Sequence, residues 1–230
     1  RITDFAPRFR QYERYYKPLM FIRKVEVISG NPRVKVKCRP VYNYGEDKFT
    51  RSRGSNHILY ESGNETLQLS TNISLSYIED ERYFALNEPK YLISTFGYKL
   101  EAPIDSTAER FLLSTKQYWR TWIKHSSIAG FQQPVVIRSA LVLKIHQYED
   151  TGAIIAASTT SLPEHPGSVR NWDYRYCWMR DTYYVITALN HIGHFEEMER
   201  YFNYITDISF RNDERYQPLF GIGGERKLTE

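Results

Sequence analysis

The most constraining feature of this sequence is a change in its hydrophobic period close to Pro103. Before that residue, apolar and polar side chains alternate in short runs broken by Gly, Asn and Pro, which is typical of antiparallel strands. After it, apolar side chains recur at the spacing of amphipathic helices. The sequence therefore predicts an α+β protein of more than one domain, in which the strands precede the helices.

Two stretches of the first hundred residues carry the strand pattern. Residues 19–42 alternate most clearly in VKVKC (34–38) and are interrupted by Gly-Asn-Pro at 30–32, which predicts two strands joined by a turn. Residues 56–100 continue the pattern in four pieces: HILYES, LQLSTNISLSYI, RYFALNE and YLISTFGYKL. By strand spacing, we expect residues 1–104 to form part of an antiparallel β-sandwich domain.

The helical part begins with an S-x-x-E capping box made by Ser106 and Glu109. This box predicts a helix over 107–124, which we interpret as a linker helix within 105–130. A second helix is expected to start at Pro134 and to run through VVIRSALVLKIHQY. Because its apolar residues surround most of the circumference, we expect it to be buried on nearly all sides.

Two further helices are predicted towards the end of the chain. TYYVITALNHIGH is stopped by Gly193, and FEEMERYFNYITDI follows at once. The second places four apolar residues on one face: Phe195, Met198, Phe202 and Ile205. The pattern predicts an antiparallel helix pair.

Composition argues against several classes of protein. No run approaches the roughly 20 apolar residues that a membrane helix needs, and we expect no membrane association. The formal charge is only +4 and its Lys and Arg residues are scattered, so we expect no nucleic-acid partner.

The cysteines and histidines offer no metal or cofactor site. Cys38 and Cys177 lie in different predicted domains without CxxC spacing, so we interpret both as free thiols, which favours a cytoplasmic location. His165 lies in a long loop with no second ligand at useful spacing, and we interpret it as solvent-facing. We expect neither a metal nor a cofactor.

The segment 171–184, NWDYRYCWMRDTYY, concentrates the residues that carry chemistry. It lies at the end of a stretch without helical period, 149–181, which is too long to be a simple connection. Aromatic rings stack on the apolar faces of sugars, and carboxylate and guanidinium groups bind sugar hydroxyls. Its aromatic and charged members are Trp172, Asp173, Tyr174, Arg175, Tyr176, Trp178, Arg180, Asp181, Tyr183 and Tyr184.

A structural interpretation of the same residues stays open at this point. Asp181 could cap the helix that follows, Arg180 could be its ion-pair partner, and the aromatic residues could belong to the core.

From Arg138 onward the sequence resembles glycoside hydrolase family 15, which includes glucoamylases, glucodextranases and microbial acid trehalases. The most specific pieces are TGAIIAASTTSLPE, the block RNWDYRYCWMRD, and the helix that ends at Gly193 before FEEMERYF. The tail LFGIGGERKLTE resembles a loop between early barrel helices of the family. In bacterial members a β-sandwich and a linker helix precede an (α/α)6 barrel. The resemblance therefore implies that 131–230 are the first helices of such a barrel, incomplete here.

The resemblance also implies site residues. By motif position, Arg180 and Asp181 would hold the hydroxyls of the sugar at the cleavage subsite, and Tyr174 and Trp178 would line the same pocket. Asp173 and Arg175 match the block, but the resemblance assigns them no role.

Catalysis in this family inverts configuration, using a Glu as general acid and a second carboxylate as base, about 6.5 to 9.5 Å apart. Both belong to motifs downstream of the block, so we expect no catalytic residue before Glu230. Glu225 and Glu230 lie in a polar loop near Arg226 and Lys227 and are interpreted as surface residues. Since the chain starts at Arg1, we expect an internal segment whose partner is the remainder of the same enzyme.

The function that the resemblance implies is inverting, exo-acting hydrolysis of α-glucosidic bonds. The expected substrate is an α-linked glucoside or oligosaccharide, with trehalose and maltooligosaccharides or starch as candidates. A non-catalytic carbohydrate-binding protein and a helical interaction module are the alternatives.

Overall fold

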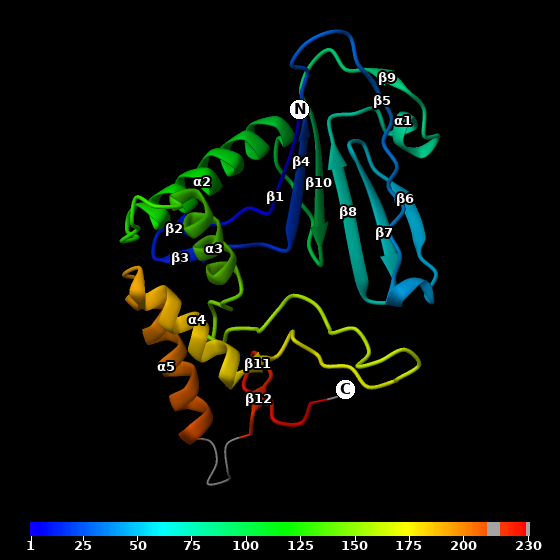
Figure 1. Ribbon diagram of the computed structural model, residues 1–230. Helices are drawn as coiled ribbons and strands as arrows, with labels where there is room; N and C mark the ends of the chain where they lie inside the picture. Colours follow the sequence, from blue (N-terminus) through cyan, green and yellow to red (C-terminus); the bar gives the residue numbers. More distant parts are fainter. Residues whose placement is uncertain (211–216, 229–230) are drawn as a thin grey trace. The chain divides into compact units, whose positions relative to one another are not determined.

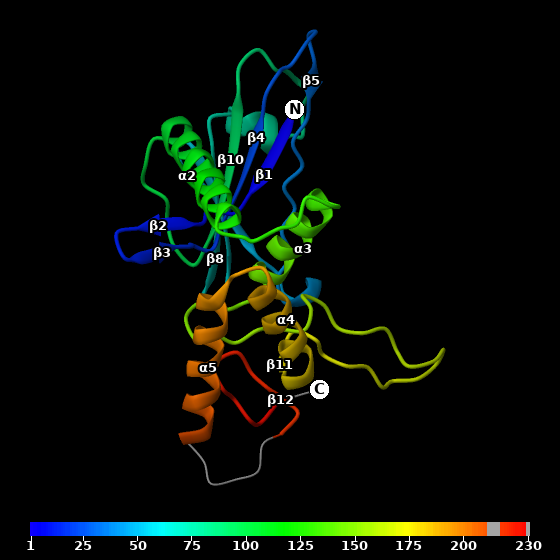
Figure 2. The same ribbon diagram turned by 60° about the vertical axis from the view of Figure 1, so that its left-hand side comes forward.

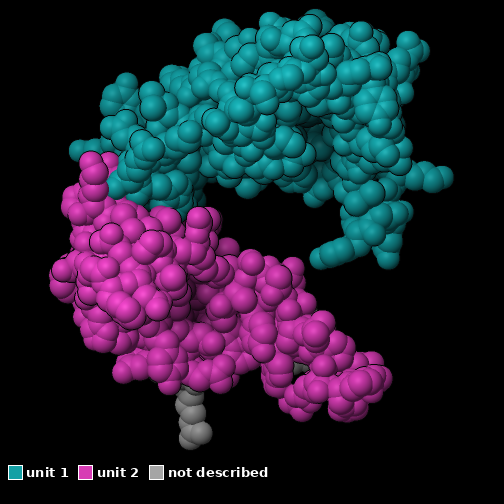
Figure 3. All heavy atoms as spheres, turned by 45° about the horizontal axis from the view of Figure 1, so that its top comes forward, with its two compact units in different colours: residues 1–120 teal, residues 121–230 magenta. Residues whose placement is uncertain are grey.

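A computed structural model describes residues 1–210 and 217–228 of the chain. It contains two compact units, residues 1–120 and residues 121–230 (Figure 3).

Unit 1 is built on a six-stranded sheet in which every neighbouring pair is antiparallel (Figure 1). This confirms the predicted antiparallel sheet, while the second layer of a sandwich stays a prediction. In spatial order the strands are β1 (Ile2–Phe5), β4 (Met20–Val25), β10 (Lys90–Phe96), β8 (Glu65–Thr71), β7 (His57–Ser62) and β6 (Thr50–Arg53).

Apart from one long helix, the remaining elements of unit 1 are short. They are the antiparallel pairs β2 (Phe9–Gln11) with β3 (Arg14–Tyr16) and β5 (Arg33–Val34) with β9 (Phe84–Ala85), the 3-10 turn η1 (Asn43–Gly45) and the helix α1 (Leu75–Glu79).

The two strands predicted within 19–42 are confirmed as β4 and β5, on either side of the break at 30–32. They do not pair with each other: β4 pairs with β1 and β10, and VKVKC contributes only Val34, the end of β5. Its alternation instead lets Val34, Val36 and Cys38 pack onto the buried cluster over one face of the sheet. One prediction for this region is wrong: LSYI, the end of the predicted strand piece LQLSTNISLSYI, lies in the helix α1, because tertiary packing buries Leu75 and Ile78, which share a helical face.

Helix α2 (Ile104–Lys124) covers the opposite face of the sheet, next to β4 and β10 (Figures 1 and 2). Ala108 and Phe111 of α2 are buried against Ile22 and Ile93. The predicted helix 107–124 is thus confirmed, although it starts earlier.

The predicted capping box is wrong. The helix begins at Ile104, and the carbonyl of Pro103 accepts the N–H of Thr107, so Ser106 lies within the first turn. Glu109 turns to the sheet instead, where it pairs with Lys24 and accepts the hydroxyl of Tyr91, both at 2.6 Å.

Unit 2 contains three helices and one short strand pair in its described part. They are α3 (Gln133–Ile145), α4 (Met179–His191) and α5 (Phe195–Phe210), with β11 (Cys177–Trp178) paired to β12 (Leu219–Phe220). The predicted helix pair is confirmed, and its turn requires a glycine because Gly193 has a φ of 88°.

The packed face of α5 differs from the predicted one. Phe195 and Phe202 are exposed, while Glu197, Tyr201 and Tyr204 are buried. The tyrosines can be buried because their hydroxyls find partners: that of Tyr204 donates to the carbonyl of Gly221 at 2.7 Å.

Helix α3 is also less buried than predicted. Val135, Val142 and Ile145 are exposed, and only Ala140 and Lys144 are fully buried. An all-round apolar pattern shows that a helix can be buried, but neighbouring elements decide which sides are covered.

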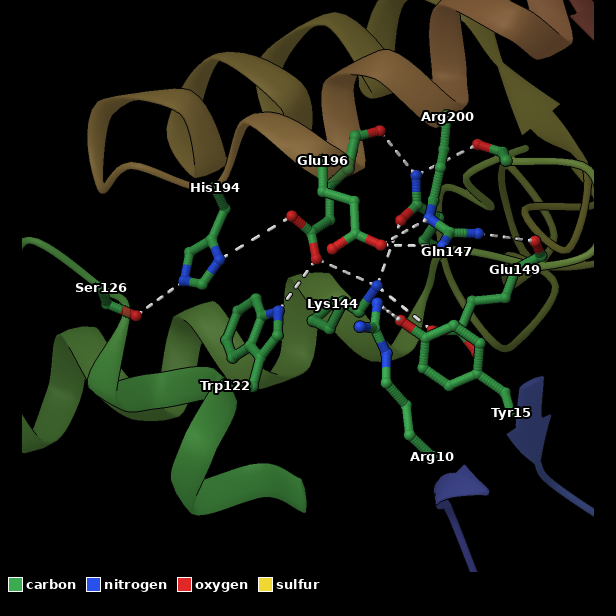
Figure 4. Close-up of polar contacts among 12 residues, drawn as sticks. Arg10, Tyr15, Trp122, Ser126, Lys144, Gln147, Glu149, His194, Glu196 and Arg200 are labelled. Atoms are coloured by element: carbon green, nitrogen blue, oxygen red, sulfur yellow. Dashed lines mark hydrogen bonds and ion pairs between the residues drawn. The ribbon is translucent and has the colours of Figure 1, made fainter. Parts of the chain in front are cut away.

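A buried polar cluster holds the centre of unit 2 together (Figure 4). Lys144 Nζ lies 3.0 Å from Glu197 Oε1 and 3.3 Å from Glu149 Oε1, and all three side chains are almost fully buried. Trp122 donates its indole N–H to Glu197 at 2.9 Å and stacks on His194 at 3.8 Å between ring centroids. Since a buried charge needs its partners, this cluster fixes α3 to the start of α5.

Both cysteines are free thiols. Burial raises the pKa of the Cys38 thiol and of the Cys177 thiol. Across residues 1–210 and 217–228, no helix is both long and apolar enough to cross a membrane.

Candidate functional site

The candidate site lies where the long loop of unit 2 returns to α4. The outgoing and returning segments of this loop run antiparallel. The N–H of Ala156 donates to the carbonyl of Tyr176 at 3.2 Å, and the N–H of Ala157 donates to that of Tyr174 at 2.9 Å. Thr160 forms an isolated bridge with Asp173 further along. The two pieces TGAIIAASTTSLPE and RNWDYRYCWMRD therefore lie side by side in an arm that extends away from α4 (Figure 2).

A tight turn at 173–176 directs the chain into β11. The Asp173 carboxylate accepts the backbone N–H of Arg175 at 2.9 Å and binds its guanidinium through Nε at 3.0 Å and Nη2 at 2.8 Å. These bonds from Arg175 hold the pKa of Asp173 below its ordinary value of 3.8. The turn is thus closed by an ionised side chain.

Three aromatic rings gather beside this turn. The indole N–H of Trp178 donates to the backbone carbonyl of Asp173 at 2.8 Å. The Trp178 ring meets the Trp172 ring edge to face at 5.9 Å and the Tyr174 ring at 6.1 Å between centroids. All three side chains are half-buried, so part of each ring is open to solvent.

Arg180 and Asp181 lie in the first turn of α4, directly after Trp178. Arg180 Nη2 lies 3.2 Å from Asp181 Oδ2, and the Arg180 side chain is 72% exposed while that of Asp181 is 33% exposed. The helix N-cap is Trp178, which makes no side-chain capping bond. A carboxylate in the first turn is favoured by the helix dipole, and both charged groups remain within reach of an external ligand.

The tail of the chain joins this region. Cys177 and Trp178 pair with Phe220 and Leu219, and Met179 N–H donates to the carbonyl of Pro218 at 3.0 Å. The loop LFGIGGERKL thus lies against the same segment that carries the candidate residues, a proximity that sequence spacing did not reveal.

The structure pairs the four predicted site residues two by two. Tyr174 and Trp178 share a ring contact, and Arg180 and Asp181 share an ion pair, with both pairs at the entry to α4. The roles of these four residues stay predictions.

The other residues considered from sequence lie apart from this group. Glu225 accepts the N–H of Gly223 within its own turn at 3.0 Å, and Glu230 lies outside the described residues. His165 is exposed at the tip of the loop arm. Within 1–210 and 217–228, no three His, Cys, Asp or Glu side chains gather as metal ligands would.

Sequence reasoning missed the contribution of Thr182. Its hydroxyl lies 2.9 Å from Trp178 O and 3.3 Å from Ile154 O, which ties the start of α4 to the long loop. Only its position one residue after Asp181 could have suggested this role.

Comparison with known proteins now identifies the second half of the chain. Residues 130–229 match the model of the family described as "Glycosyl hydrolases family 15". They belong to glycosyl hydrolase family 15. The matched range contains the loop arm, the turn at 173–176 and the α4 entry, so the candidate site lies within the family segment.

Similarity to curated proteins extends to unit 1. The chain is 34% identical to the trehalase of Thermoplasma volcanium and 35% identical to that of Thermoplasma acidophilum, in each case over 100% of this chain. It is 32% identical to the trehalase of Mycobacterium tuberculosis over 92% of this chain. The chain spans only 37%, 40% and 33% of the lengths of these relatives. No solved structure matches it.

Proposed function

We propose that this chain is the sugar-binding segment of an inverting, exo-acting hydrolase of α-glucosidic bonds, with trehalose as the substrate. The observation that carries the proposal is the joint placement of an Arg180–Asp181 pair and the Tyr174 and Trp178 rings at the entry to α4. The names of the relatives, which are trehalases, favour trehalose over maltooligosaccharides.

The chemistry of a hexose matches these groups. Its C–H face can lie on the half-buried rings of Trp178 and Tyr174, which gain contact area at little entropic cost. Its vicinal hydroxyls can donate to the Asp181 carboxylate and accept from the Arg180 guanidinium, and the charges strengthen those bonds.

Within this proposal, residues 1–104 are part of the β-sandwich domain, 105–130 the linker helix and 131–230 the first helices of an (α/α)6 barrel. The observed α2 and the pair α4 and α5 are compatible with that assignment. Exposed apolar residues on α3, such as Val135 and Ile145, suit a helix with further neighbours in the intact barrel.

We assign neither the general acid nor the base to a described residue. Glu225 is engaged by the N–H of Gly223, and the carboxylates of Asp173 and Asp181 are each engaged by an arginine. An inverting acid must instead carry a proton in a site built to raise its pKa.

The test is a titration of the 230-residue chain with trehalose and, separately, with maltotriose, followed by tryptophan fluorescence. We expect saturable quenching by trehalose, and Asp181→Ala should weaken it roughly 10- to 100-fold because a charge-assisted bond is lost. Asp207→Ala, at an exposed site on α5, is the matched control and should bind as the parent does.

The remaining outcomes separate the alternatives. Binding without release of glucose supports a segment that lacks the acid and base, whereas turnover would place both within these residues. If neither trehalose nor maltotriose quenches the tryptophan fluorescence, the proposal is rejected and an interaction module is favoured.

A further inference from the structure

The turn at 173–176 contains an ion pair whose role the proposed function leaves open. Asp173 and Arg175 lie two residues apart, and their side chains make a bidentate pair with Nε–Oδ1 at 3.0 Å and Nη2–Oδ2 at 2.8 Å. The Asp173 carboxylate also accepts the N–H of Arg175, which closes an Asx turn. One carboxylate thus fixes both the backbone and the long side chain of Arg175.

The backbone of this turn holds the indole of Trp178. The Trp178 N–H donates to the carbonyl of Asp173 at 2.8 Å, so the plane of the peptide after Asp173 sets where the ring lies. Rotation of that peptide would move the carbonyl away and release the indole. The Asx turn opposes such rotation because it bonds the N–H of Arg175, two residues on, to the Asp173 side chain.

The same turn also carries the neighbouring rings. Tyr174 is its second residue, and its carbonyl accepts Ala157 N–H, so its backbone is held from the other strand of the arm. Trp172 lies directly before it and is held by Ser161, whose Oγ accepts the Trp172 N–H at 2.7 Å. Both rings then meet the Trp178 ring in an edge-to-face arrangement.

The exposure of the pair fits a positioning role better than a role in stability. The Arg175 side chain is 54% exposed and that of Asp173 is 16% exposed, so the pair lies at the surface of the loop rather than in the core. Exposed pairs of this kind contribute little to the stability of a fold. A precise bidentate geometry is nonetheless well suited to hold one local conformation.

We propose that Asp173 and Arg175 are positioning residues that hold Trp178 and Tyr174 in the orientation that stacks on a sugar ring. This inference rests on the proposed function for its ligand. Neither residue touches the ligand; the pair acts through the peptide after Asp173 and the indole bonded to it.

The experiment uses the 230-residue chain labelled with 5-fluorotryptophan and observed by fluorine NMR. The Trp178 signal is assigned with Trp178→Phe. Asp173→Ala should shift or broaden that signal, because the indole loses its fixed acceptor. The same variant should weaken trehalose binding on the order of tenfold, while the urea midpoint of unfolding stays close to that of the parent.

Four further variants serve as comparisons and controls. Asp173→Asn retains one oxygen for the Arg175 N–H but loses the bidentate pair, and should show a smaller effect. Arg175→Lys retains the positive charge without the planar fork, and should bind more tightly than Arg175→Ala. Glu164→Ala removes another arginine pair of the same arm, with Arg170 at 3.8 Å, and should leave the Trp178 signal unchanged.

The outcomes distinguish this inference from the proposed function. An unchanged Trp178 signal in Asp173→Ala and Asp173→Asn would overturn the positioning role, whether or not sugar binds. If the signal moves but the unsubstituted chain binds no sugar, the proposed function fails while the hold on Trp178 stands. If Asp173→Ala fails to fold, Asp173→Asn and Arg175→Lys supply the same two readouts.

Discussion

Gly152 is a residue at which the long loop of unit 2 (149–176) approaches the backbone of α5 closely. It has a φ of 90°, and a Cβ added there would lie 2.1 Å from the carbonyl oxygen of Arg200. Both the backbone conformation and the space therefore require glycine.

We predict that Gly152→Ala lowers the free energy of unfolding by at least about 2 kcal/mol, through strain and overpacking. Urea denaturation followed by circular dichroism measures this loss. Gly130→Ala is the control, because nothing lies within 4 Å of a Cβ at that residue and its φ is not positive. Equal stability of the two variants would contradict the close packing of loop and helix.

Lys144 is a second residue on which unit 2 depends. It is 1% exposed and neutralises the buried carboxylates of Glu149 and Glu197. We predict that Lys144→Met lowers the free energy of unfolding by about 3 to 5 kcal/mol, because two buried carboxylates lose their cation.

Glu196→Ala is the matched control for Lys144→Met. It removes the ion pair between Glu196 and Arg200, which both lie on α5, and should change the free energy of unfolding by less than about 1 kcal/mol. If the two variants lose similar stability in urea, the buried cluster is not the stabilising feature that its geometry indicates.

At the scale of the element, periodicity located helices well and identified their packed faces poorly. The helices at 104–124, 133–145 and the α4–α5 pair lie close to where the sequence pattern placed them. Their buried faces depend on which other elements lie nearby, so α5 buries Tyr201 and Tyr204 and leaves Phe195 and Phe202 exposed. The strand predicted at VKVKC is short for the same reason. Only Val34 belongs to β5, and both valines pack against the buried cluster without joining the six-stranded sheet.

The exposed apolar side of α3 leads to a prediction at this scale. Val142 is 45% exposed and Ile145 is 61% exposed, and clustered apolar surface promotes association. We expect the double variant Val142→Lys, Ile145→Lys to shift sedimentation velocity profiles of the chain towards the monomer without lowering the urea midpoint.

Val169→Lys is the control for that double variant. It makes the same kind of substitution in the loop arm, where Val169 is 99% exposed. Should it reduce association as strongly, added positive charge rather than the α3 surface would explain the effect.

At the scale of the whole molecule, the titrating groups predict how stability responds to acid. Burial lowers the pKa of His194 below 6.5, a direction that Lys144 reinforces and Glu197 opposes. As the pH drops below 6.5, His194 is therefore protonated in the unfolded chain before it is protonated in the folded chain. The free energy of unfolding falls over that range. Bonds from Arg23 and Arg175 hold the pKa values of Asp4 and Asp173 below 3.8, so a further loss follows as the pH drops below 3.8.

We predict a urea midpoint that declines between about pH 7 and about pH 5 and declines again in stronger acid. His194→Gln should flatten the first decline, because glutamine has no proton to gain, and should leave the second unchanged. A variant profile parallel to that of the parent would exclude His194 as the group responsible.

The sequence by itself determined the order of strands and helices, the antiparallel sheet, the helix pair turned by Gly193 and the family segment. Local period and motif spacing encode these features, since each depends on residues close together in the chain. Only the tertiary structure decided that β4 pairs with β10, that Lys144 is buried between Glu149 and Glu197, and that the Asp173 carbonyl holds Trp178. These features depend on which groups folding brings within bonding distance, and hydrophobic period carries no record of such partners.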